Sequence, residues 1–526
     1  MGKKNNKNHV KIKYTKKDVS GQQSVQEQAV VVKPIPKVTA NAQNKASVLR
    51  KLIIDAEVIT KSPLRIGSGD NDGITDILIL KNKAGKYFIP STSLAGVLRS
   101  ELESIYSQEV ADKLFGSIDD SGNQSMLIVN DTELSNTKLI HRDGVAIDSL
   151  TGTTKHGAKY DYEALDRGAK GNIRLELTVR YNDVRNNVLS NEEYQHNKFA
   201  DRNDCYGELM ATIADLLAQG IRIGSLTAKG FGKLAASSTV YCYDYSFYEK
   251  QDALKWLDYI KDDSLRGDVI YKGSKAKLLC SKDDFYVSFN CSLRSSLLIA
   301  DYNLSTGNQE EDYSVLERME QKNTISAVQM VSGDDFVIPG TSIKGVVRNG
   351  AIKILLAING GNLDKAEAFV NEMMGYSLEN TNESKKSKLY VDEVYIKNGM
   401  LVPHKQTRNR IDRFSGGTIE TALFTVNPVW QQEKDISTIR MTFKVHECSA
   451  AEAGLMLLLI KELWDGSLNI GSDKAVGRGV LQGIECKIVY KGRNYTVTEY
   501  EGAMNATGQK ELLESYVQAL AGEMND

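Results

Sequence analysis

The 526-residue sequence has few residues of the kinds that build metal centres or disulfide frameworks, with only six cysteines and six histidines. The cysteines form no CxxC pair, and no HExxH motif or zinc-like spacing relates the histidines to them. We therefore expect reduced thiols rather than a zinc site or disulfides. No apolar stretch approaches membrane-spanning length, and none follows Met1-Gly2-Lys3-Lys4, so the sequence predicts a cytoplasmic protein with no membrane partner.

The chain also lacks a marked excess of either charge, since its formal net charge is −2. The net charge therefore does not indicate a nucleic-acid partner, and any basic surface must be local. One local concentration of positive charge is present, because seven lysines lie among the first 17 residues. Together with the polar composition of residues 1–48, these lysines predict a flexible basic arm. This arm is either a solvated leader or a tail that contacts nucleic acid or a neighbouring subunit.

What the chain does contain is the same order of motifs twice. Residues 88–99 (FIPSTSLAGVLR) return as 337–348 (VIPGTSIKGVVR), and residues 224–234 (GSLTAKGFGKL) return as 471–481 (GSDKAVGRGVL). A block at 142–148 returns between them at 408–413. This arrangement predicts a duplicated globular domain. The predicted boundaries are a first domain at 49–249, a linker at 250–275, a second domain at 276–490 and a C-terminal extension at 491–526.

Apolar periodicity predicts strands and helices in the order β-α-β-β-α-β within each copy. In the second copy the pattern predicts strands at 285–293 and 439–445 and a helix at 450–464. A Ser-Thr-Ser cluster after Pro90 predicts the N-cap of the first helix of the first copy. The order is typical of the α+β class, and we expect two tandem ferredoxin-like domains.

The repeated turn before the first helix of each copy places hydroxyls and free backbone N–H groups at a helix N-terminus, which can hold a phosphate. Cations about one turn further on would add contacts to the phosphate. The alternative is that these groups only cap and solvate the helices. The candidate residues are Ser91, Thr92, Ser93 and Arg99 in the first copy and Thr341, Ser342, Lys344 and Arg348 in the second.

A glycine-rich block precedes the closing strand of each copy. Its glycines let the backbone approach a ligand closely, and cations lie beside them. The block is neither a Walker A motif nor a dinucleotide fingerprint. Its candidate residues are Gly224, Lys229, Gly230 and Gly232 in the first copy and Gly471, Lys474, Gly477, Arg478 and Gly479 in the second.

The helix-start motif, Leu114-Phe115-Gly116 after the next helix, and the C-terminal glycine block together resemble the RAMP superfamily of CRISPR proteins. The similarity covers about residues 50–240 and 283–485, and Met373-Met374-Gly375 departs from the pattern in the second half. Each half resembles the backbone subunit of type III CRISPR–Cas effector complexes. Two fused copies are similar to the tandem subunits of III-D-like systems.

The resemblance implies RRM-like RAMP domains that grip a CRISPR guide RNA within an antiviral ribonucleoprotein complex. Its partners would be the guide RNA, the complementary target RNA and other effector subunits. It also implies an inserted thumb in each domain, around 140–170 and 402–427, that wedges into the guide–target duplex. The cations there fit phosphate binding, although a solvated charged loop is the alternative. The candidates are Arg142, Arg408, Arg410 and Arg413.

Finally, the resemblance implies metal-dependent cleavage of target RNA by an aspartate that precedes the hairpin, and Asp76 matches that place. Its carboxylate would hold Mg²⁺ or another divalent cation, or orient the attacking 2′-hydroxyl. The corresponding place in the second copy, near Ile325-Ser326, has no acid, so that copy is either silent or uses another residue. Two alternatives stay open: a non-catalytic RNA-binding scaffold, and a ribonuclease that processes precursor guide RNA.

Overall fold

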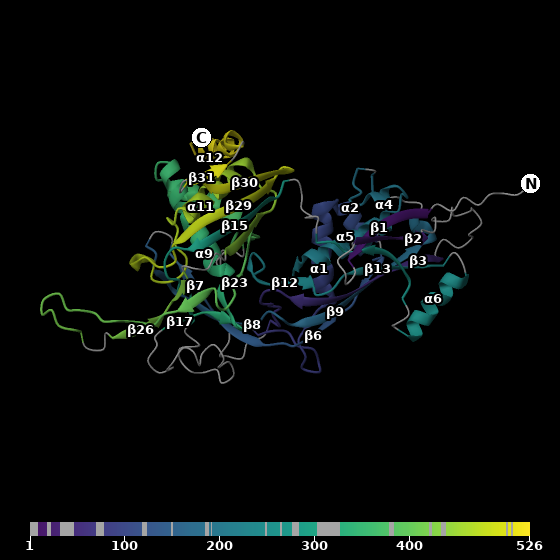
Figure 1. Cartoon of the computed structure of the whole chain (residues 1–526), viewed down its shortest axis with the longest axis horizontal. Helices are drawn as coiled ribbons and strands as arrows, with labels where there is room; N and C mark the ends of the chain where they lie inside the picture. The colour runs from purple at the N-terminus through teal and green to yellow at the C-terminus, as the bar shows by residue number, and fades with distance from the viewer. Residues whose placement is uncertain are drawn as a thin grey trace, which may run out of the picture. The chain divides into compact units, whose positions relative to one another are not determined.

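The structure is a computed structural model of the chain (Figure 1). It describes residues 9–17, 23–31, 47–69, 78–117, 122, 124–148, 151–184, 189–190, 192–247, 250–262, 266–275, 283–301, 327–377, 383–419, 423–432, 438–500, 503–506 and 509–525.

Contacts between residues divide the chain into two compact units, which do not follow the order of the sequence. The first unit comprises Met1–Ile53, Glu176–Thr212 and Cys242–Tyr271. The second comprises Ile54–Leu175, Ile213–Tyr241 and Lys272–Asp526. The second unit therefore contains most of both sequence repeats.

In the first unit, β1 (His9–Lys17) pairs antiparallel with β2 (Gln23–Val31). The flexible basic arm predicted for residues 1–48 thus contains two paired strands, and its flexibility stays a prediction. That prediction depended on the absence of helical periodicity, whereas Val10, Ile12 and Tyr14 alternate with polar residues at the period of a strand. The unit's other elements are α3 (Tyr181–Val184), α4 (Asn197–Ala200), β13 (Tyr241–Ser246), α6 (Lys250–Lys261) and β14 (Asp268–Lys272).

The sheet of the first copy has its strands in the order β10-β12-β3-β9-β6-β4. Numbered along the chain, the four central strands take the spatial order 4-1-3-2. Two helices, α1 (Ser91–Ile105) and α5 (Cys205–Gln219), separate them in sequence. The remaining bounds of this copy are β3 (Val48–Thr60), β4 (Phe88–Ile89), α2 (Gln108–Phe115), β5 (Leu127–Val129), β6 (Thr132–Ser135), β9 (Lys170–Arg180), β10 (Ile221–Arg222), β11 (Lys229–Gly230) and β12 (Lys233–Ala236).

The second copy repeats that order. Its sheet runs β22-β28-β15-β29, antiparallel throughout, and β30 and β31 extend it beyond β29. The α+β class is confirmed, and the matching 4-1-3-2 order in both copies is consistent with the expected ferredoxin-like domains. The bounds are β15 (Phe285–Leu293), β22 (Leu389–Asp392), β28 (Ile439–Val445), β29 (Leu481–Tyr490), β30 (Arg493–Tyr500) and β31 (Ala503–Ala506).

Three helices, α9 (Gly340–Ile358), α11 (Ala450–Trp464) and α12 (Lys510–Asn525), pack with this sheet (Figure 1). Together they enclose a continuous apolar core that includes the fully buried Trp464 and Phe289. Burial of such large side chains is the main stabilising contribution of the domain. The core fixes the outer, polar face of the sheet in place.

The first helices of both copies begin in the same way, although not as the sequence indicated. Pro90 and Pro339 are the N-cap residues of α1 and α9, and neither helix has a side-chain cap hydrogen bond. The Ser-Thr-Ser cluster therefore occupies the first turn, and its prediction as the N-cap was wrong. An extended proline is well suited to this position because it needs no N–H partner.

The inserted segments of the second unit are mostly short strands. In the first copy, β7 (Leu139–Ile147) and β8 (Thr154–Leu165) form an antiparallel hairpin. The remaining elements are β16 (Ala300–Asp301), β17 (Ala327–Gln329), β18 (Val331–Ser332), β19 (Asp335–Ile338), α10 (Leu363–Met374), β20 (Tyr376–Ser377), β21 (Ser384–Lys385), β23 (Val394–Ile396), β24 (Leu401–Pro403), β25 (Gln406–Arg408), β26 (Phe424–Asn427), β27 (Val429–Gln431) and the 3-10 turn η2 (Lys474–Val476). Among the described residues, no helix is long and apolar enough to span a membrane.

Candidate nucleic-acid interface

The glycine block of the first copy binds the second copy within the second unit. β11 pairs in parallel with β22, with Lys229 opposite Val391 and Gly230 opposite Asp392. Gly230 has a φ of +96°, and a Cβ there would lie 2.9 Å from the backbone N of Glu393. The glycine is thus required by the approach of another strand, and not by a ligand.

Four further glycines of the blocks also serve backbone packing. A Cβ at Gly224 or Gly232 would lie closer than 3.0 Å to the carbonyl oxygen of Arg65 or Ile223. Gly471 and Gly479 meet the carbonyl oxygens of Leu298 and Ile470 in the same way. All four have positive φ. Gly477 differs, because nothing described lies within 4 Å of a Cβ built there.

Arg142 lies in a buried ion pair and not at an exposed thumb surface. Its Nη1 donates to Glu393 Oε1 at 2.7 Å, and the two residues are only 6% and 7% exposed. Tyr395 donates to the other carboxylate oxygen at 2.7 Å. Burial raises the pKa of Glu393, and the guanidinium opposes that shift. Direct contact of Arg142 with RNA does not fit this burial, and the pair instead joins β7 to the segment after β22.

Arg99 and Arg348 occupy equivalent places in α1 and α9, and each donates hydrogen bonds to the end of the next helix in the chain. Arg99 donates to the carbonyl of Gly116 at 2.8 Å and to Asp112. Arg348 donates to the carbonyl of Gly375 at 3.2 Å and to Asn371. Both arginines thus hold the C-terminal end of a helix, α2 in one copy and α10 in the other. This role explains why both copies carry an arginine here.

The predicted cations of the second thumb and glycine block divide into two groups. Arg478 is 2% exposed and donates to Asp473, Ser296 and Gln406, so it is committed to the fold. Arg408 donates to Asp473 at 3.3 Å. Lys474 is exposed. Arg410 and Arg413 are also exposed, and their side chains have no hydrogen bond or ion pair with the residues that the structure describes.

The two predicted helix N-termini are not equivalent. In the first copy the backbone N–H of Ser91 donates to Asp131 Oδ1 at 2.6 Å, so a carboxylate already satisfies this end. In the second copy the N-terminus of α9, with Thr341 and Ser342 half-buried in its first turn, packs on the backbone of Lys229. A carboxylate is therefore present at the start of α1, whereas the backbone carbonyl of Lys229 lies beside the start of α9.

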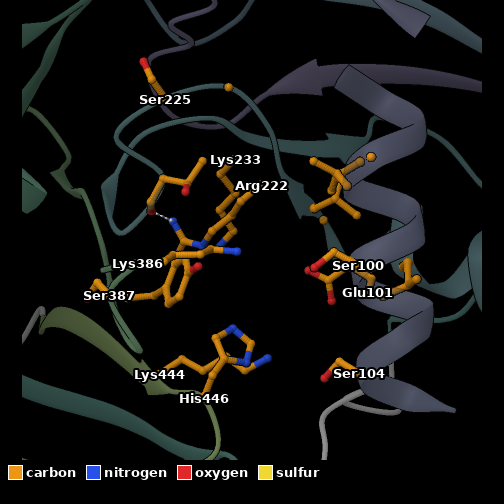
Figure 2. A pocket seen from close by; sticks show the side chains of 18 of the residues that line it. Ser100, Glu101, Ser104, Arg222, Ser225, Lys233, Lys386, Ser387, Lys444 and His446 are labelled. Atoms are coloured by element: carbon orange, nitrogen blue, oxygen red, sulfur yellow. Dashed lines mark hydrogen bonds between the residues drawn. The ribbon is translucent and has the colours of Figure 1, made fainter. Parts of the chain in front are cut away.

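A cavity of about 1130 Å³ lies between the α1 surface and the outer face of the second sheet, all within the second unit. Figure 2 shows Ser100, Glu101 and Ser104 of α1 across the cavity from the cations of the opposite wall. Thr92, Ser93 and Gly224 also line it. The basic residues of its lining are Arg65, Arg222, Lys233, Lys386, Lys388, Lys444 and His446.

Most of these cations have a carboxylate partner. Arg222 and Lys233 both bind Asp392, Lys388 binds Glu452, and Lys444 binds Asp284. His446 shares Asp284 and makes an edge contact with Tyr390, with ring centroids 5.0 Å apart. The exposed Lys386 has no hydrogen bond or ion pair among the described residues. The cavity wall is thus polar and partly neutralised.

A second group of cations comes from the N-terminal half of α9 and from the first copy. We call Arg65, Lys229, Lys344 and Arg348 the cation cluster. Burial, then Lys229 and Arg348, lower the pKa of Lys344 to about 7. Burial, then Arg348 and Arg65, lower the pKa of Lys229. Lys229 and Arg348 thus act on Lys344, and Arg348 and Arg65 act on Lys229.

Hydrogen bonds leave the cation cluster incompletely satisfied. Lys344 is 8% exposed and donates only to neutral oxygens, Ser387 Oγ at 2.6 Å and Leu389 O at 3.1 Å. Arg65 is 7% exposed, and its Nε has no partner among the described residues. The sequence offered Arg65 only as a possible cation of the cleavage site, and its influence on Lys229 depends on the fold.

Asp76, the predicted catalytic and metal-binding residue, lies outside the described residues. So does the segment near Ile325-Ser326. Within the described part of the chain, no group of three or more His, Cys, Asp or Glu side chains is placed to hold a metal ion. The five described cysteines are buried and form no disulfide with one another.

The fold and the cation cluster define a duplicated α+β protein in which both copies contribute to one group of cations. The chain belongs to the RAMP superfamily, which it matches over residues 57–235 and 292–482, more than half of its length. No curated protein matches the sequence. Among solved structures, it is similar to a chain of the Type III-B Cmr-beta bound to cognate target RNA, with 12% identity and a TM-score of 0.27. That match covers 37% of this chain and 61% of the other.

Proposed function

We propose that the protein is a backbone subunit of a type III, III-D-like CRISPR–Cas effector complex, and that it binds the guide RNA. Membership of the RAMP superfamily supports the class of complex. The observation that carries RNA binding is the cation cluster, in which Lys229 and Lys344 have no carboxylate partner among the described residues. Phosphates of an RNA backbone would supply the missing negative charge. Complementary target RNA and other effector subunits would be the further partners.

Binding of single-stranded RNA by the purified full chain tests this proposal. We expect binding that weakens with salt, because phosphate contacts release counterions, with a slope of about −0.7 in log affinity per contact. Lys229→Gln is expected to weaken binding to all sequences alike and to reduce that slope by about one contact. Fluorescence anisotropy over a salt series gives both quantities.

Lys510→Gln is the matched control, because Lys510 is 78% exposed on α12 and carries the same charge. It should leave affinity and slope unchanged. If the wild-type chain ignores RNA even at low ionic strength, the proposed function is wrong. If Lys510→Gln and Lys229→Gln weaken binding equally, the effect is one of overall charge, and the cation cluster is not the binding site.

We further propose that the first copy cleaves the bound target RNA with Mg²⁺ or another divalent cation, and that Asp76 is the catalytic residue. This proposal depends on the family resemblance and on the place of Asp76 before the hairpin. In the assembled complex, Asp76→Asn is expected to abolish one set of cleavage products, because an amide is a poor ligand for the ion and a poor base. The measurement is the product pattern of a labelled target RNA.

Asp72→Asn, in the same segment, controls for the loss of one negative charge and should leave the products unchanged. If the Asp76→Asn complex gives unchanged products at every cleavage position, only the non-catalytic scaffold function would remain. Cleavage of precursor guide RNA that survives EDTA would instead support the processing function.

A further inference from the structure

One wall of the cavity is the outer face of the second sheet, and the strand register places aromatic side chains on it. Tyr390 of β22 and Tyr286 of β15 both lie opposite Lys444 of β28, so the three side chains form one row across the sheet. Side chains directly opposite each other on antiparallel strands have Cβ atoms about 5 Å apart. All three residues line the cavity. The register therefore brings two rings and a cation to the same wall.

His446 adds a third ring to this wall. Its ring lies 5.0 Å from that of Tyr390, and its Nδ1 lies 3.3 Å from Asp284 Oδ1. Tyr390 and Asp284 are both less than 9% exposed, so they hold the imidazole and do not themselves face a ligand. The side chain of His446 is 30% exposed, and Figure 2 shows it across the cavity from Glu101 and Ser104. The imidazole is thus held in place with part of its surface open to a ligand.

The charges of the cavity suit a nucleobase better than a phosphate. Lys444, Lys388 and Arg222 already have carboxylate partners. On the α1 side, the half-buried carboxylate of Glu101 has no hydrogen bond or ion pair among the described residues. An ionised carboxylate only accepts hydrogen bonds, so it favours a ligand with N–H groups and repels a phosphate. An unpaired base offers both a π face for the rings and N–H groups for this acceptor.

We propose that the cavity takes an unpaired base of single-stranded RNA, which stacks on Tyr286 and His446, while the adjoining phosphate contacts Lys386. The inference rests on the proposed RNA-binding function and adds to it which part of the RNA enters the cavity. Lys386 lines the cavity and is exposed, and its side chain has no partner among the described residues. The cavity volume of about 1130 Å³ is sufficient, since small-ligand sites commonly measure about 300–1,000 Å³. A base inside a duplex does not fit, because its neighbours cover its faces and its partner occupies its edge.

A uridine-rich single strand that carries one 2-aminopurine tests this site, because stacking on an aromatic ring quenches the fluorescence of that base. Binding to the full wild-type chain is expected to quench it. Tyr286→Leu removes the ring and keeps an apolar side chain on the strand. This variant should bind about fivefold to about a hundredfold more weakly and lose most of the quenching. Tyr286→Phe keeps the ring and should retain both the affinity and the quenching.

Two further variants separate the base from the phosphate. Lys386→Gln should reduce the salt slope by about one contact and leave the quenching of the bound probe unchanged, whereas Tyr286→Leu should leave the slope unchanged. Tyr243→Leu is the matched control, because Tyr243 is half-buried on β13 of the first unit and lies outside the lining of the cavity. It should bind and quench the probe as the wild type does.

Crosslinking of the wild type to a single strand that contains 4-thiouridine locates the base without any variant. An adduct on the peptide that contains Tyr286 or His446 would support the inference, and adducts at other places alone would overturn it. Salt-dependent RNA binding without quenching of 2-aminopurine also overturns it but leaves the proposed function intact, as does a Tyr286→Leu protein that binds and quenches like the wild type. Absence of RNA binding at every salt concentration would contradict the proposed function itself.

Discussion

Arg142→Met is expected to lower the free energy of unfolding of the second unit by about 3–5 kcal/mol. The substitution removes the partner of Glu393 and leaves its carboxylate 7% exposed with only Tyr395 as a hydrogen-bond donor. An uncompensated buried charge costs far more than the loss of an exposed ion pair. The change is measured as a fall in the midpoint of urea unfolding, followed by tyrosine and tryptophan fluorescence.

The deficit of Arg142→Met should depend on pH in a definite direction. Without the guanidinium, burial acts on Glu393 with only the hydrogen bond from Tyr395 opposing it, so the pKa of its carboxyl in the folded state lies above its unfolded value. Stability that depends on such a group is complete below the unfolded pKa and is lost as pH rises through the folded pKa. The variant should therefore lose more stability at about pH 8 than at about pH 5.

Two further variants test the cause. Adding Glu393→Gln to Arg142→Met removes the buried charge and keeps an acceptor for Tyr395, so most of the stability should return. Arg410→Met, on the exposed second thumb, should change stability by less than about 0.5 kcal/mol. An Arg142→Met protein as stable as Arg410→Met would show that the ion pair does not hold the hairpin to the second copy.

Three regular elements of the second copy could be predicted to the residue, whereas the strand expected at 388–395 is divided into β22 and β23. β15 and β28 begin and end where the alternation of apolar and polar residues begins and ends, and α11 matches residues 450–464. These segments are long, strongly periodic and buried on one face, so local pattern and tertiary packing agree. The capping box of Ser449 and Glu452 marks the start of α11 equally clearly.

The partners of the cations that recur in the two repeats could not be predicted in the same way. Repetition correctly indicated that Arg99 and Arg348 have the same role, but it could not distinguish a phosphate from the carbonyls of Gly116 and Gly375. Charge type fixes what a side chain can bind, whereas its partner depends on which segments the fold brings near. Arg142 shows this most clearly, because Glu393 lies 251 residues away in the chain.

The glycine blocks illustrate the same limit. A glycine with positive φ is required both where a ligand approaches and where another backbone does, and the sequence is identical in the two cases. Here β22 occupies the place beside Gly230 in which a ligand was expected. The corresponding Gly477 of the second copy has no such neighbour among the described residues. Duplication therefore preserved the loop but gave its two copies different surroundings.

Within the second glycine block, Gly477 and Gly479 also differ in their surroundings, and this difference predicts a large change in stability. Gly479→Ala is expected to destabilise the second unit by more than about 4 kcal/mol, or to prevent its folding. The new Cβ would lie closer than 3.0 Å to the carbonyl oxygen of Ile470, and the φ of +70° is strained for alanine as well. The Ile470 backbone and Gly479 cannot move apart without breaking the hydrogen bond that Ile470 N donates to Gly479 O at 3.0 Å.

Gly477→Ala is the matched control, since its φ of +82° carries the same backbone strain but no described atom lies within 4 Å of the added Cβ. It should cost only about 1–2 kcal/mol. Gly232→Ala should behave like Gly479→Ala, because Gly232 meets the carbonyl oxygen of Ile223 in the equivalent place. Urea unfolding of the three variants beside the wild type measures the comparison. Equal stability of Gly479→Ala and Gly477→Ala would mean that positive φ alone, and not the close backbone approach, requires glycine in this block.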